Sequence, residues 1–517
     1  MVEQAELKGL FRTSYLLLDR RVLGGFRILF GGVLLYDLLR RFPDAALLWS
    51  SDGVLSSQAL RKVPQDSSQF SLLFELTSGQ AVQVAFVAMA LVFALYTAGL
   101  YTRVMQVLAL ICYASLNARN LFFEDGGTTC VILLLGWTLF LPLGDWFSVD
   151  ALRCEARLPN LASRLRARKQ RRAPLVSLAA LALLLQAAAI YWLNAAHKTG
   201  HTWRAGDAVH LVLWQHRVNT PFAVWLAAHQ PSWFSPLFSW LTVRTEFLLP
   251  LLLLWPWRIE VTRPIAFALA LGLHAGIALT LTLGPFSYVM ICLVWLCLPG
   301  GALDAVRSRL PRRLGWRLAQ KRARLLSRLR RWRGSSPPRR FDWFGLGSFG
   351  PRLREAVLGL MLVVELCSLL QSNRAIPKAL KPGHHEWLLA YKAYLRGWQG
   401  WSMFAPNAPD EDGTMVIDAV TKSGRHIDPF TGQAPDFEQV RRGVVPHSIA
   451  VSDYLFNMRN SRNRRYRHDL RRYLRRYADA DDRIVSAEVF WVSYVPPKRG
   501  SHEPGPIKKE LLWKIKT

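Results

Sequence analysis

Apolar residues collect along this chain in blocks of about 18 to 22 residues, a length that matches about 30 Å of hydrocarbon in helical conformation. The blocks are separated by charged or polar stretches, and many of the 20 tryptophans lie at block ends, where their rings favour the headgroup layer. The third and eighth blocks are short or contain polar residues, so two alternatives stay open for them: a tilted helix, or a helix that lies partly in the membrane interface. The pattern predicts nine transmembrane helices, at 22–39, 81–100, 103–118, 127–145, 175–196, 237–257, 263–283, 286–300 and 355–372.

The charges of the loops predict the orientation of these helices. Eight Lys and Arg residues lie between Arg153 and Arg172, and sixteen lie between Arg307 and Arg354. Loops rich in Lys and Arg stay in the cytoplasm, and an even number of predicted spans separates these two. The N-terminus is therefore expected in the cytoplasm, and residues 373–517 on the opposite side. The N-terminal segment lacks a cleavable signal pattern, so the first helix is expected to act as an uncleaved signal.

The formal net charge of +30 raises the question of a nucleic-acid partner. Because the charge concentrates in the loops between apolar blocks, we expect none, and the lipid bilayer is the expected partner. Leucines at helical spacing between Leu310 and Leu329 alternate with arginines. This predicts a basic amphipathic helix on the inner membrane surface, with anionic lipid bound at the basic loops.

The C-terminal 140 or so residues resemble a soluble domain. Residues 415–427 predict a hairpin with Gly424 in its turn, residues 447–478 predict basic helical structure, and residues 483–495 alternate like a strand. The fold class is thus an all-α polytopic membrane bundle with a small α+β extracytoplasmic domain. The expected division is a bundle of eight spans over 1–300, a basic cytoplasmic loop over 301–354, a ninth span over 355–372 and the domain over 373–517.

Polar and ionisable residues within spans are costly, so each is a candidate functional residue. Asn194, His197 and Lys198 lie where the fifth span reaches the outer surface, in YWLNAAHKTGHTW. From its position alone, Lys198 either extends its ammonium group to the interface or, if buried, acts as a base. Arg27 in the first span, near Asp37, is either interfacial or part of a site.

Two further spans contain ionisable residues. Arg244 and Glu246 enter the sixth span together, where either a structural salt bridge or a catalytic role is open. His274 lies in the middle of the seventh span, as a hydrogen-bonded core residue or as a ligand-binding residue. No second ligand is spaced for a metal, and no metal is expected. The six cysteines form no disulfide or metal pattern, and nucleophile elbows, phosphate loops and dinucleotide fingerprints are absent from the sequence.

At these residues the sequence resembles the HTTM (horizontally transferred transmembrane) domain family, the bacterial membrane proteins related to the vitamin K-dependent γ-glutamyl carboxylase. The resemblance covers most of residues 15–300, and a further similar piece follows the bundle. The segments that carry it are FRILFGG near Arg27, SLNARN ending at Asn120, LPLGDWFSVD at 141–150, YWLNAAHKTGHTW at 191–203, HAGIALTLTLGPFSYVM at 274–290 and GWQGWSMFAPNAPDEDG at 397–413.

The resemblance implies nine spans, a bacterial inner-membrane location and a pocket that binds a quinol or a similar lipophilic substrate. In the carboxylases a reduced vitamin K is oxygenated with the help of a lysine, and the strong base so formed removes a glutamate γ-proton before CO2 adds. That lysine matches Lys198, and a functionally important transmembrane histidine matches His274, so these two are the expected catalytic residues. The expected substrate-binding residues are Arg27, Asn194, His197, Trp203, Glu246, Phe286 and Tyr288.

The sequence also departs from the carboxylases. They have a histidine in the outer turn before the fourth span, where this chain has Phe123-Glu-Asp-Gly-Gly127, and its C-terminal region is much shorter. The first function left open is a membrane enzyme that uses a reduced, vitamin K-like quinone for carboxylation or quinol oxygenation, with a protein or peptide substrate on the extracytoplasmic side. The second is a non-enzymatic assembly or maturation subunit that binds a partner protein through its C-terminal domain. A transporter is a weaker third option, since no internal repeat is visible.

Overall fold

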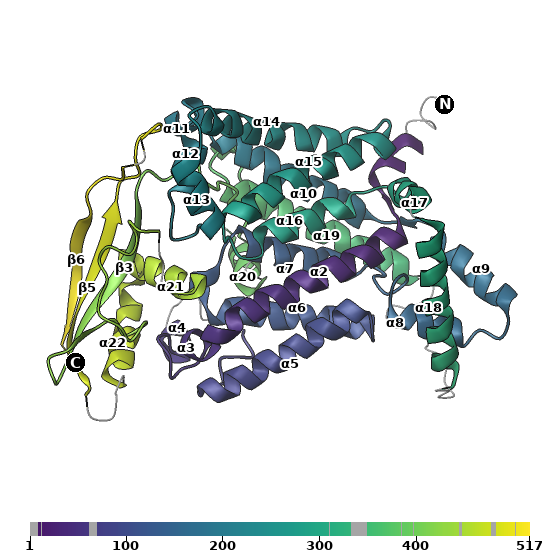
Figure 1. Cartoon of the computed structure of the whole chain (residues 1–517). Helices are drawn as coiled ribbons and strands as arrows, with labels where there is room; N and C mark the ends of the chain where they lie inside the picture. The colour runs from purple at the N-terminus through teal and green to yellow at the C-terminus, as the bar shows by residue number, and fades with distance from the viewer. Residues whose placement is uncertain are drawn as a thin grey trace.

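The computed structural model is mainly helical, with a small sheet at one end (Figure 1). It describes residues 9–11, 13–61, 70–309, 311–331, 349–383, 385–395, 398–443, 447–476, 482–501 and 503–516.

Within these residues, nine helices run back and forth between the two ends of a bundle, and each overlaps one predicted span. We call one end the domain end, because the C-terminal sheet and its helices lie there, and the other the basic end, because the arginine-rich helices lie there. The nine helices are α2 (Arg20–Arg41), α5 (Gly79–Ala98), α6 (Thr102–Arg119), α7 (Gly126–Thr138), α10 (Leu178–His197), α14 (Phe234–Leu254), α15 (Ile259–Thr280), α16 (Phe286–Leu296) and α19 (Phe349–Ser372).

Five of the described helical segments are long and apolar enough to cross a membrane, which makes the chain a multi-pass membrane protein. They are Arg20–Trp49, Gly79–Ala98, Leu178–His197, Phe234–Leu254 and Ile259–Thr280. Residues Phe286–Leu296 with Gly300–Arg309 would add a sixth, bent by 100° at its break. The helix Gly126–Thr138 is apolar but shorter. The number of nine spans therefore stays a prediction.

Burial distinguishes a central helix from peripheral ones. In α10, 72% of the apolar window is buried, against 28% in α14 and 22% in α15. Small residues let neighbours approach α10 closely, and its start is fixed by Ser177, whose side chain accepts from Ala179 N. The helices α14 and α15 instead expose large apolar side chains along their lengths. Their outer faces therefore suit contact with lipid.

Short elements close the basic end. Strands β1 (Leu17–Leu18) and β2 (Leu175–Val176) pair there. The Asp304 carboxylate forms ion pairs with Arg21 at 2.6 Å and with Arg172 at 3.1 Å. The predicted amphipathic helix is confirmed as a helix, α18, while Leu310 and residues 332–348 of the predicted inner loop lie outside the described residues. The helices of this end are α8 (Val149–Ala156), α9 (Leu161–Arg172), α17 (Gly300–Arg309) and α18 (Arg312–Arg331).

The C-terminal region forms a four-stranded antiparallel sheet with the order β4-β3-β5-β6. The predicted hairpin is confirmed, because β3 and β4 pair through Ala419 and Ile427, and Gly424 has a left-handed φ of +83° in its turn. The predicted basic helical region, 447–478, is helical in three pieces between Ile449 and Arg476, while residues 477 and 478 lie outside the described residues. The elements are β3 (Asp412–Thr421), β4 (His426–Ile427), α21 (Ile449–Arg459), η5 (Ser461–Tyr466), α22 (Arg467–Arg476), β5 (Ile484–Tyr494) and β6 (Lys508–Lys516).

Helices α21 and α22 lie between the sheet and the bundle (Figure 1). Asp469 accepts from the backbone and the hydroxyl of Ser56 at 2.9 and 2.8 Å, and Asn457 donates to Phe122 O at 3.1 Å. These contacts fix the domain to the short elements that surround the bundle at this end. Those elements are η1 (Phe42–Asp44), α3 (Ala45–Trp49), α4 (Ser57–Arg61), η2 (Leu121–Phe123), α11 (His201–Arg204), α12 (Ala208–Leu213), α13 (Pro221–His229), η4 (Lys378–Leu380) and α20 (Glu386–Leu395).

Candidate functional site

One face of the central helix α10 carries three polar side chains. Tyr191, Asn194 and Lys198 are spaced at i, i+3 and i+7, which places them in a row along the helix. All three residues are buried. A buried polar row in an apolar bundle needs partners on other elements, and each of the three has one.

Lys198, at the end of α10, forms an ion pair with Glu246 of α14. Its Nζ lies 2.8 Å from Oε1 and 2.7 Å from Oε2 of the carboxylate, and the two side chains are only 4% and 10% exposed. The ammonium also lies 5.1 Å from the centre of the Trp203 ring, as in a cation–π contact. Lys198 is thus a buried, fully engaged cation and does not extend to solvent.

Deeper in the bundle, Tyr191 is hydrogen-bonded to His274 of α15. The Tyr191 hydroxyl lies 2.9 Å from His274 Nε2, and the ring of Phe286 meets the imidazole edge-on at 5.6 Å between centroids. Among the described residues, His274 Nδ1 is buried and has no hydrogen-bond partner. Leaving a buried polar atom unpaired costs about 1–3 kcal/mol, so this nitrogen is suited to a ligand.

These two pairs belong to one site. Seven residues separate Tyr191 from Lys198, which corresponds to about 10 Å along the helix axis. Asn194 lies between them on the same face. The site therefore runs from the ion pair at the domain end to the Tyr191–His274 pair inside the bundle, with α14 and α15 on its outer side.

A segment without regular secondary structure, residues 398–408, crosses the domain end of this site, and we call it the strap. Met403 N donates to Asn194 Oδ1 at 3.0 Å, and Trp203 Nε1 donates to Phe404 O at 2.8 Å. Gly200 N donates to Pro406 O at 2.9 Å. The strap contacts so closely that a Cβ on Gly200 would lie 1.9 Å from Asn407 Oδ1 and 2.5 Å from Pro406 O. Glycine at position 200 is therefore required by this approach.

The beginning of the strap is held by a buried polar network. Gln186 Nε2 donates to Gln399 Oε1 at 2.8 Å, and Gln399 Nε2 donates to Glu365 Oε2 at 2.5 Å. Asn373 accepts from Trp401 N at 2.9 Å and donates to Gln399 O at 2.7 Å. Side chains of α10 and α19 thus fix the strap from two directions.

The turn before α7 completes the wall of the site. Asp125 caps this helix by accepting from Thr128 N at 2.7 Å. A Cβ on Gly127 would lie 2.6 Å from Phe286 N, and one on Gly126 would lie 3.2 Å from Met403 Sδ. The position at which the carboxylases carry a histidine is thus occupied here by a capped glycine turn that packs against Phe286 and the strap.

Arg27 lies away from this site, toward the basic end. Its guanidinium donates to Thr97 O at 2.9 Å and to Phe147 O at 2.5 Å, so it satisfies a free carbonyl at the end of α5 and fixes the loop between α7 and α8. Asp37 does not pair with it. That carboxylate binds Arg40 at 2.8 Å and Arg41 at 2.7 Å.

Three other residues considered from the sequence have separate surroundings. His197 accepts from Ala375 N at 3.1 Å through Nε2, beside the site. Tyr288 is exposed and its ring meets that of Tyr36 at 5.1 Å. Arg244 is exposed over the Trp240 ring at 5.3 Å, so the partner of Glu246 is Lys198.

A second polar cluster, not anticipated from the sequence, lies where the domain meets α12. His216 N donates to Asp412 Oδ2 at 2.8 Å, and the Tyr494 hydroxyl donates to Trp214 O at 2.8 Å. Burial raises the pKa of Asp412 to about 7, although Arg217 and backbone donors act in the opposite direction. Burial also lowers the pKa of His216.

Among the described residues, no group of three or more His, Cys, Asp or Glu side chains could hold a metal ion. All six cysteines are free thiols. Sequence reasoning missed Gln186, Glu365 and Gln399. The signal for Glu365 was available, because a carboxylate within an apolar span is a candidate by default. Gln399 gave no such signal, because its buried position depends on the path of the strap.

Comparison with known proteins identifies the family of this chain. The family model described as HTTM domain matches residues 15–300, which is more than half of the chain and includes α2 to α16. No curated protein and no solved structure matches significantly. The matched residues contain Tyr191, Asn194, Lys198, Glu246 and His274, whereas the strap follows them. The chain belongs to the HTTM domain family.

Proposed function

We propose that this protein is a membrane enzyme that binds a reduced quinone or a similar lipophilic substrate beside Tyr191 and His274, with Lys198 as the base. The observation that carries the proposal is the polar row on α10, in which an ion pair and a histidine with a free ring nitrogen are enclosed by apolar helices. Few polar groups in an apolar wall are typical of sites for lipophilic molecules.

The residues present fit such a molecule. Among the described residues, His274 Nδ1 is buried without a partner. A neutral imidazole has one donor and one acceptor nitrogen, so Nδ1 is an acceptor if Nε2 donates to Tyr191 and a donor if Nε2 accepts from it. It could therefore bind a hydroxyl or carbonyl oxygen. Phe286 supplies an aromatic edge beside it. When bound, a reduced quinone would supply the hydroxyl that loses a proton.

The Lys198–Glu246 pair supports a role in proton transfer. If the ammonium passes a proton to Glu246, the resulting amine can accept a proton from a substrate hydroxyl, and the carboxylic acid holds the displaced proton. The two carboxylate oxygens at 2.7 and 2.8 Å from Nζ provide a direct path. Whether the onward reaction is carboxylation or quinol oxygenation is part of the test below.

The position of the site beside lipid-facing helices supports a lipophilic substrate. Glu246 and His274 lie on α14 and α15, the helices with little buried surface, and these helices expose Phe247, Leu251 and Leu279. The strap covers the domain end of the same site. We propose that the substrate enters between helices from the membrane.

The proposed topology has nine spans in a bacterial inner membrane. The N-terminus and the basic end lie in the cytoplasm, and the C-terminal domain lies on the extracytoplasmic side. The arginine-rich helices α9 and α18 at one end support this orientation by the positive-inside rule. The alternating directions of the nine helices agree with it. Cysteine accessibility labelling at exposed positions of α18 and β6 in intact cells would test it.

The function is tested with the full chain in lipid nanodiscs and a reduced prenylated naphthoquinone. Binding is followed by tryptophan fluorescence, quinol oxidation by absorbance, and carboxylation by incorporation of labelled CO2 into added glutamyl peptides. We expect Lys198→Ala to retain quinol binding and to lose turnover by about 10²-fold or more, as for removal of a general base. Wild-type turnover in Lys198→Ala would contradict the proposal.

Arg204→Ala is the matched control, because it removes an exposed cation six residues beyond Lys198, at the end of α11. It should keep both binding and turnover. Loss of turnover in both variants would show that the region tolerates no change of charge, and would remove the evidence for Lys198 as the base.

The second function, an assembly subunit, rested on the basic helices of 447–478 and on the aromatic segment Trp398–Phe404. These features are engaged within the chain, since Tyr454 and Leu470 are buried and the strap is bonded to α10 and α11. A partner would therefore have to bind the outer side of the domain. Co-purification that survives Lys198→Ala but is lost on substitution of exposed domain residues such as Val485 and Leu511 would favour this function.

A further inference from the structure

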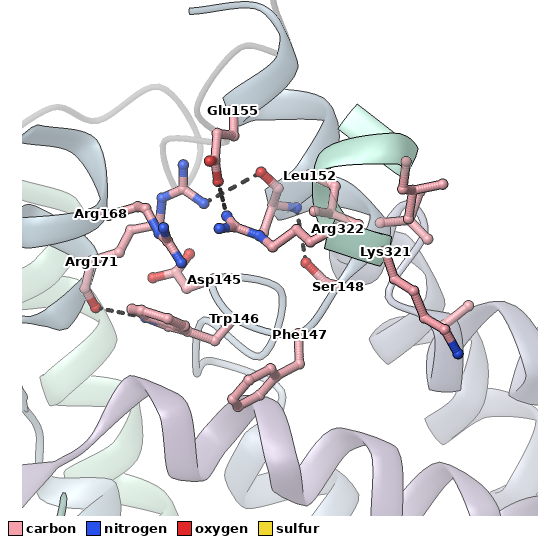
Figure 2. A pocket seen from close by; sticks show the side chains of 14 residues that line it. Asp145, Trp146, Phe147, Ser148, Leu152, Glu155, Arg168, Arg171, Lys321 and Arg322 are labelled. Atoms are coloured by element: carbon pink, nitrogen blue, oxygen red, sulfur yellow. Dashed lines mark hydrogen bonds and ion pairs between the residues drawn. The ribbon is translucent and has the colours of Figure 1, made fainter. Parts of the chain in front are cut away.

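A cavity of about 430 Å³ lies at the basic end, between α8, α9, α18 and the loop after α7. Figure 2 shows Arg168, Arg171, Arg322 and Glu155 gathered on one side of it, with Trp146 and Phe147 on the side of α2. Lys321 also lines the cavity. It is unrelated to the site beside Lys198, and the inference does not depend on the proposed function.

The lining has an excess of positive charge. Four cationic side chains face two carboxylates: Glu155 pairs with Arg322, and Asp145 pairs with Arg20 from outside the lining. Neither Arg168 nor Arg171 has an ion pair among the described residues. Arg171 Nη2 is buried and without a hydrogen-bond partner in the same part of the chain. Burial lowers the pKa of Arg322. The positive charges of Arg168 and Arg171 also lower it, whereas the carboxylate of Glu155 raises it.

The other side of the cavity is apolar and accessible. Phe147 is 58% exposed and Leu325 is 43% exposed, and Ala98, the last residue of the candidate span α5, also lines the cavity. The cavity thus begins where a membrane-crossing helix ends. A ligand that fits must combine negative charge with an apolar part and be present at the membrane surface.

The walls are built by specific contacts. Trp146 Nε1 donates to Arg171 O at 3.0 Å, which joins the loop to α9. Arg27 binds Phe147 O from below, and Phe147 adopts a left-handed φ of +54°. That conformation is unfavourable for a bulky residue, and here it places an aromatic ring on the apolar side of the cavity, across from the arginines (Figure 2).

We propose that this cavity binds one anionic phospholipid of the adjacent leaflet. Its phosphate would contact the guanidinium groups of Arg168 and Arg171, and an acyl chain would lie against Phe147 and Leu325. Guanidinium groups suit phosphate because they donate two parallel hydrogen bonds. The apolar side distinguishes a lipid from a water-soluble phosphate ester of the same charge.

The test uses the delipidated full-length protein in a neutral detergent, titrated with short-chain phosphatidylglycerol, short-chain phosphatidylcholine, glycerol phosphate and inorganic phosphate. Binding is measured by native mass spectrometry and by thermal shift. We expect phosphatidylglycerol to bind at least about tenfold more tightly than the other three probes, and Arg168→Gln/Arg171→Gln to weaken it at least about tenfold. Arg166→Gln/Lys169→Gln removes the same charge from exposed positions of the same helix and should change affinity less than about twofold.

Leu325→Gln provides a test that leaves the arginines and the net charge in place, at an exposed position of α18. It should weaken phosphatidylglycerol and leave glycerol phosphate unchanged. Equal affinity for glycerol phosphate and phosphatidylglycerol would identify a soluble phosphate ligand and overturn the lipid assignment. Equal losses of phosphatidylglycerol affinity in the two double variants would show that general surface charge causes the effect, and would overturn the site.

Discussion

Lys198 and Glu246 join the central helix α10 to the peripheral helix α14 through two contacts of 2.8 and 2.7 Å between Nζ and the carboxylate oxygens. Both side chains are buried, and each neutralises the other in a region where a lone charge would be strongly unfavourable. The pair therefore helps to hold α14 against α10, and in the proposed function it is also the proton-transfer pair. Its removal should have separable effects on stability and on activity.

The first prediction concerns stability. Lys198→Met leaves Glu246 buried and unpaired, and should lower the free energy of unfolding by about 3–5 kcal/mol. Lys198→Met/Glu246→Gln removes both charges and should recover most of that loss while remaining inactive. Thermal unfolding of both variants in nanodiscs checks this. A double variant no more stable than the single one would contradict a paired, mutually neutralising arrangement.

The second prediction concerns substrate binding at His274. His274→Leu removes the free Nδ1 and the partner of Tyr191, and should weaken quinol binding by about 1–3 kcal/mol, or about 5- to 150-fold. Tyr191→Phe keeps the imidazole and should weaken binding less. Tyr36→Phe, in the exposed aromatic pair with Tyr288, serves as the control. Fluorescence titration with the quinol distinguishes these outcomes.

The third prediction concerns the strap. Gly200→Ala places a methyl group against Asn407 Oδ1 and Pro406 O, so the strap must move away from α10. Faster hydrogen exchange at residues 403–408 is expected, with little change in the C-terminal sheet. Gly272→Ala, where nothing lies within 4 Å of the added Cβ, should leave exchange unchanged. Wild-type exchange of the strap in Gly200→Ala would show that this contact does not hold it.

The fourth prediction concerns pH. Burial raises the pKa of Asp412 to about 7, so the folded protein binds this proton more tightly than the unfolded chain, where an aspartate ionises near pH 4. The free energy of unfolding should therefore fall as the pH rises from about 4 to about 7, and the full penalty is present above that range.

Asp412→Asn keeps an acceptor for His216 N and removes the charge. It should stabilise the protein by about 2–4 kcal/mol at pH 8 and have little effect at pH 4. Thermal unfolding across this range measures the difference from wild type. A difference that does not depend on pH would mean that Asp412 ionises like an exposed aspartate.

Local sequence patterns predicted which segments form helices and strands better than they predicted which of these elements contact one another. Apolar block length identified nine segments that each contain a helix, although the fourth is helical only as far as Thr138, and Gly424 identified the β3–β4 turn. Glu246 was considered with Arg244, two residues away on the chain, but side chains at i and i+2 of a helix do not face each other. Its partner Lys198 lies 48 residues away in sequence, and that contact depends on how α14 packs against α10, which no local pattern specifies.

The same distinction applies to the rest of the site. Lys198 and His274 were selected as costly residues within spans and from the family resemblance. Arg27 was selected on the same ground, yet its guanidinium donates to backbone carbonyls at the basic end. The segment that forms the strap was noticed as family-like, but its course across the site depends on hydrogen bonds of its own backbone groups with Asn194, Gly200 and Trp203. Backbone partners leave no residue pattern in the sequence.

The strap also determines when the site becomes complete during synthesis. Residues 398–408 are made about 100 residues after α16, the last helix of the family match. The nascent bundle must therefore exist for a time with Asn194 and Trp203 lacking the partners that Met403 and Phe404 provide. An assembling chain would hold an immature, open site until its C-terminal part emerges, so the domain end of the site beside Lys198 and Glu246 is covered only when the protein is nearly finished.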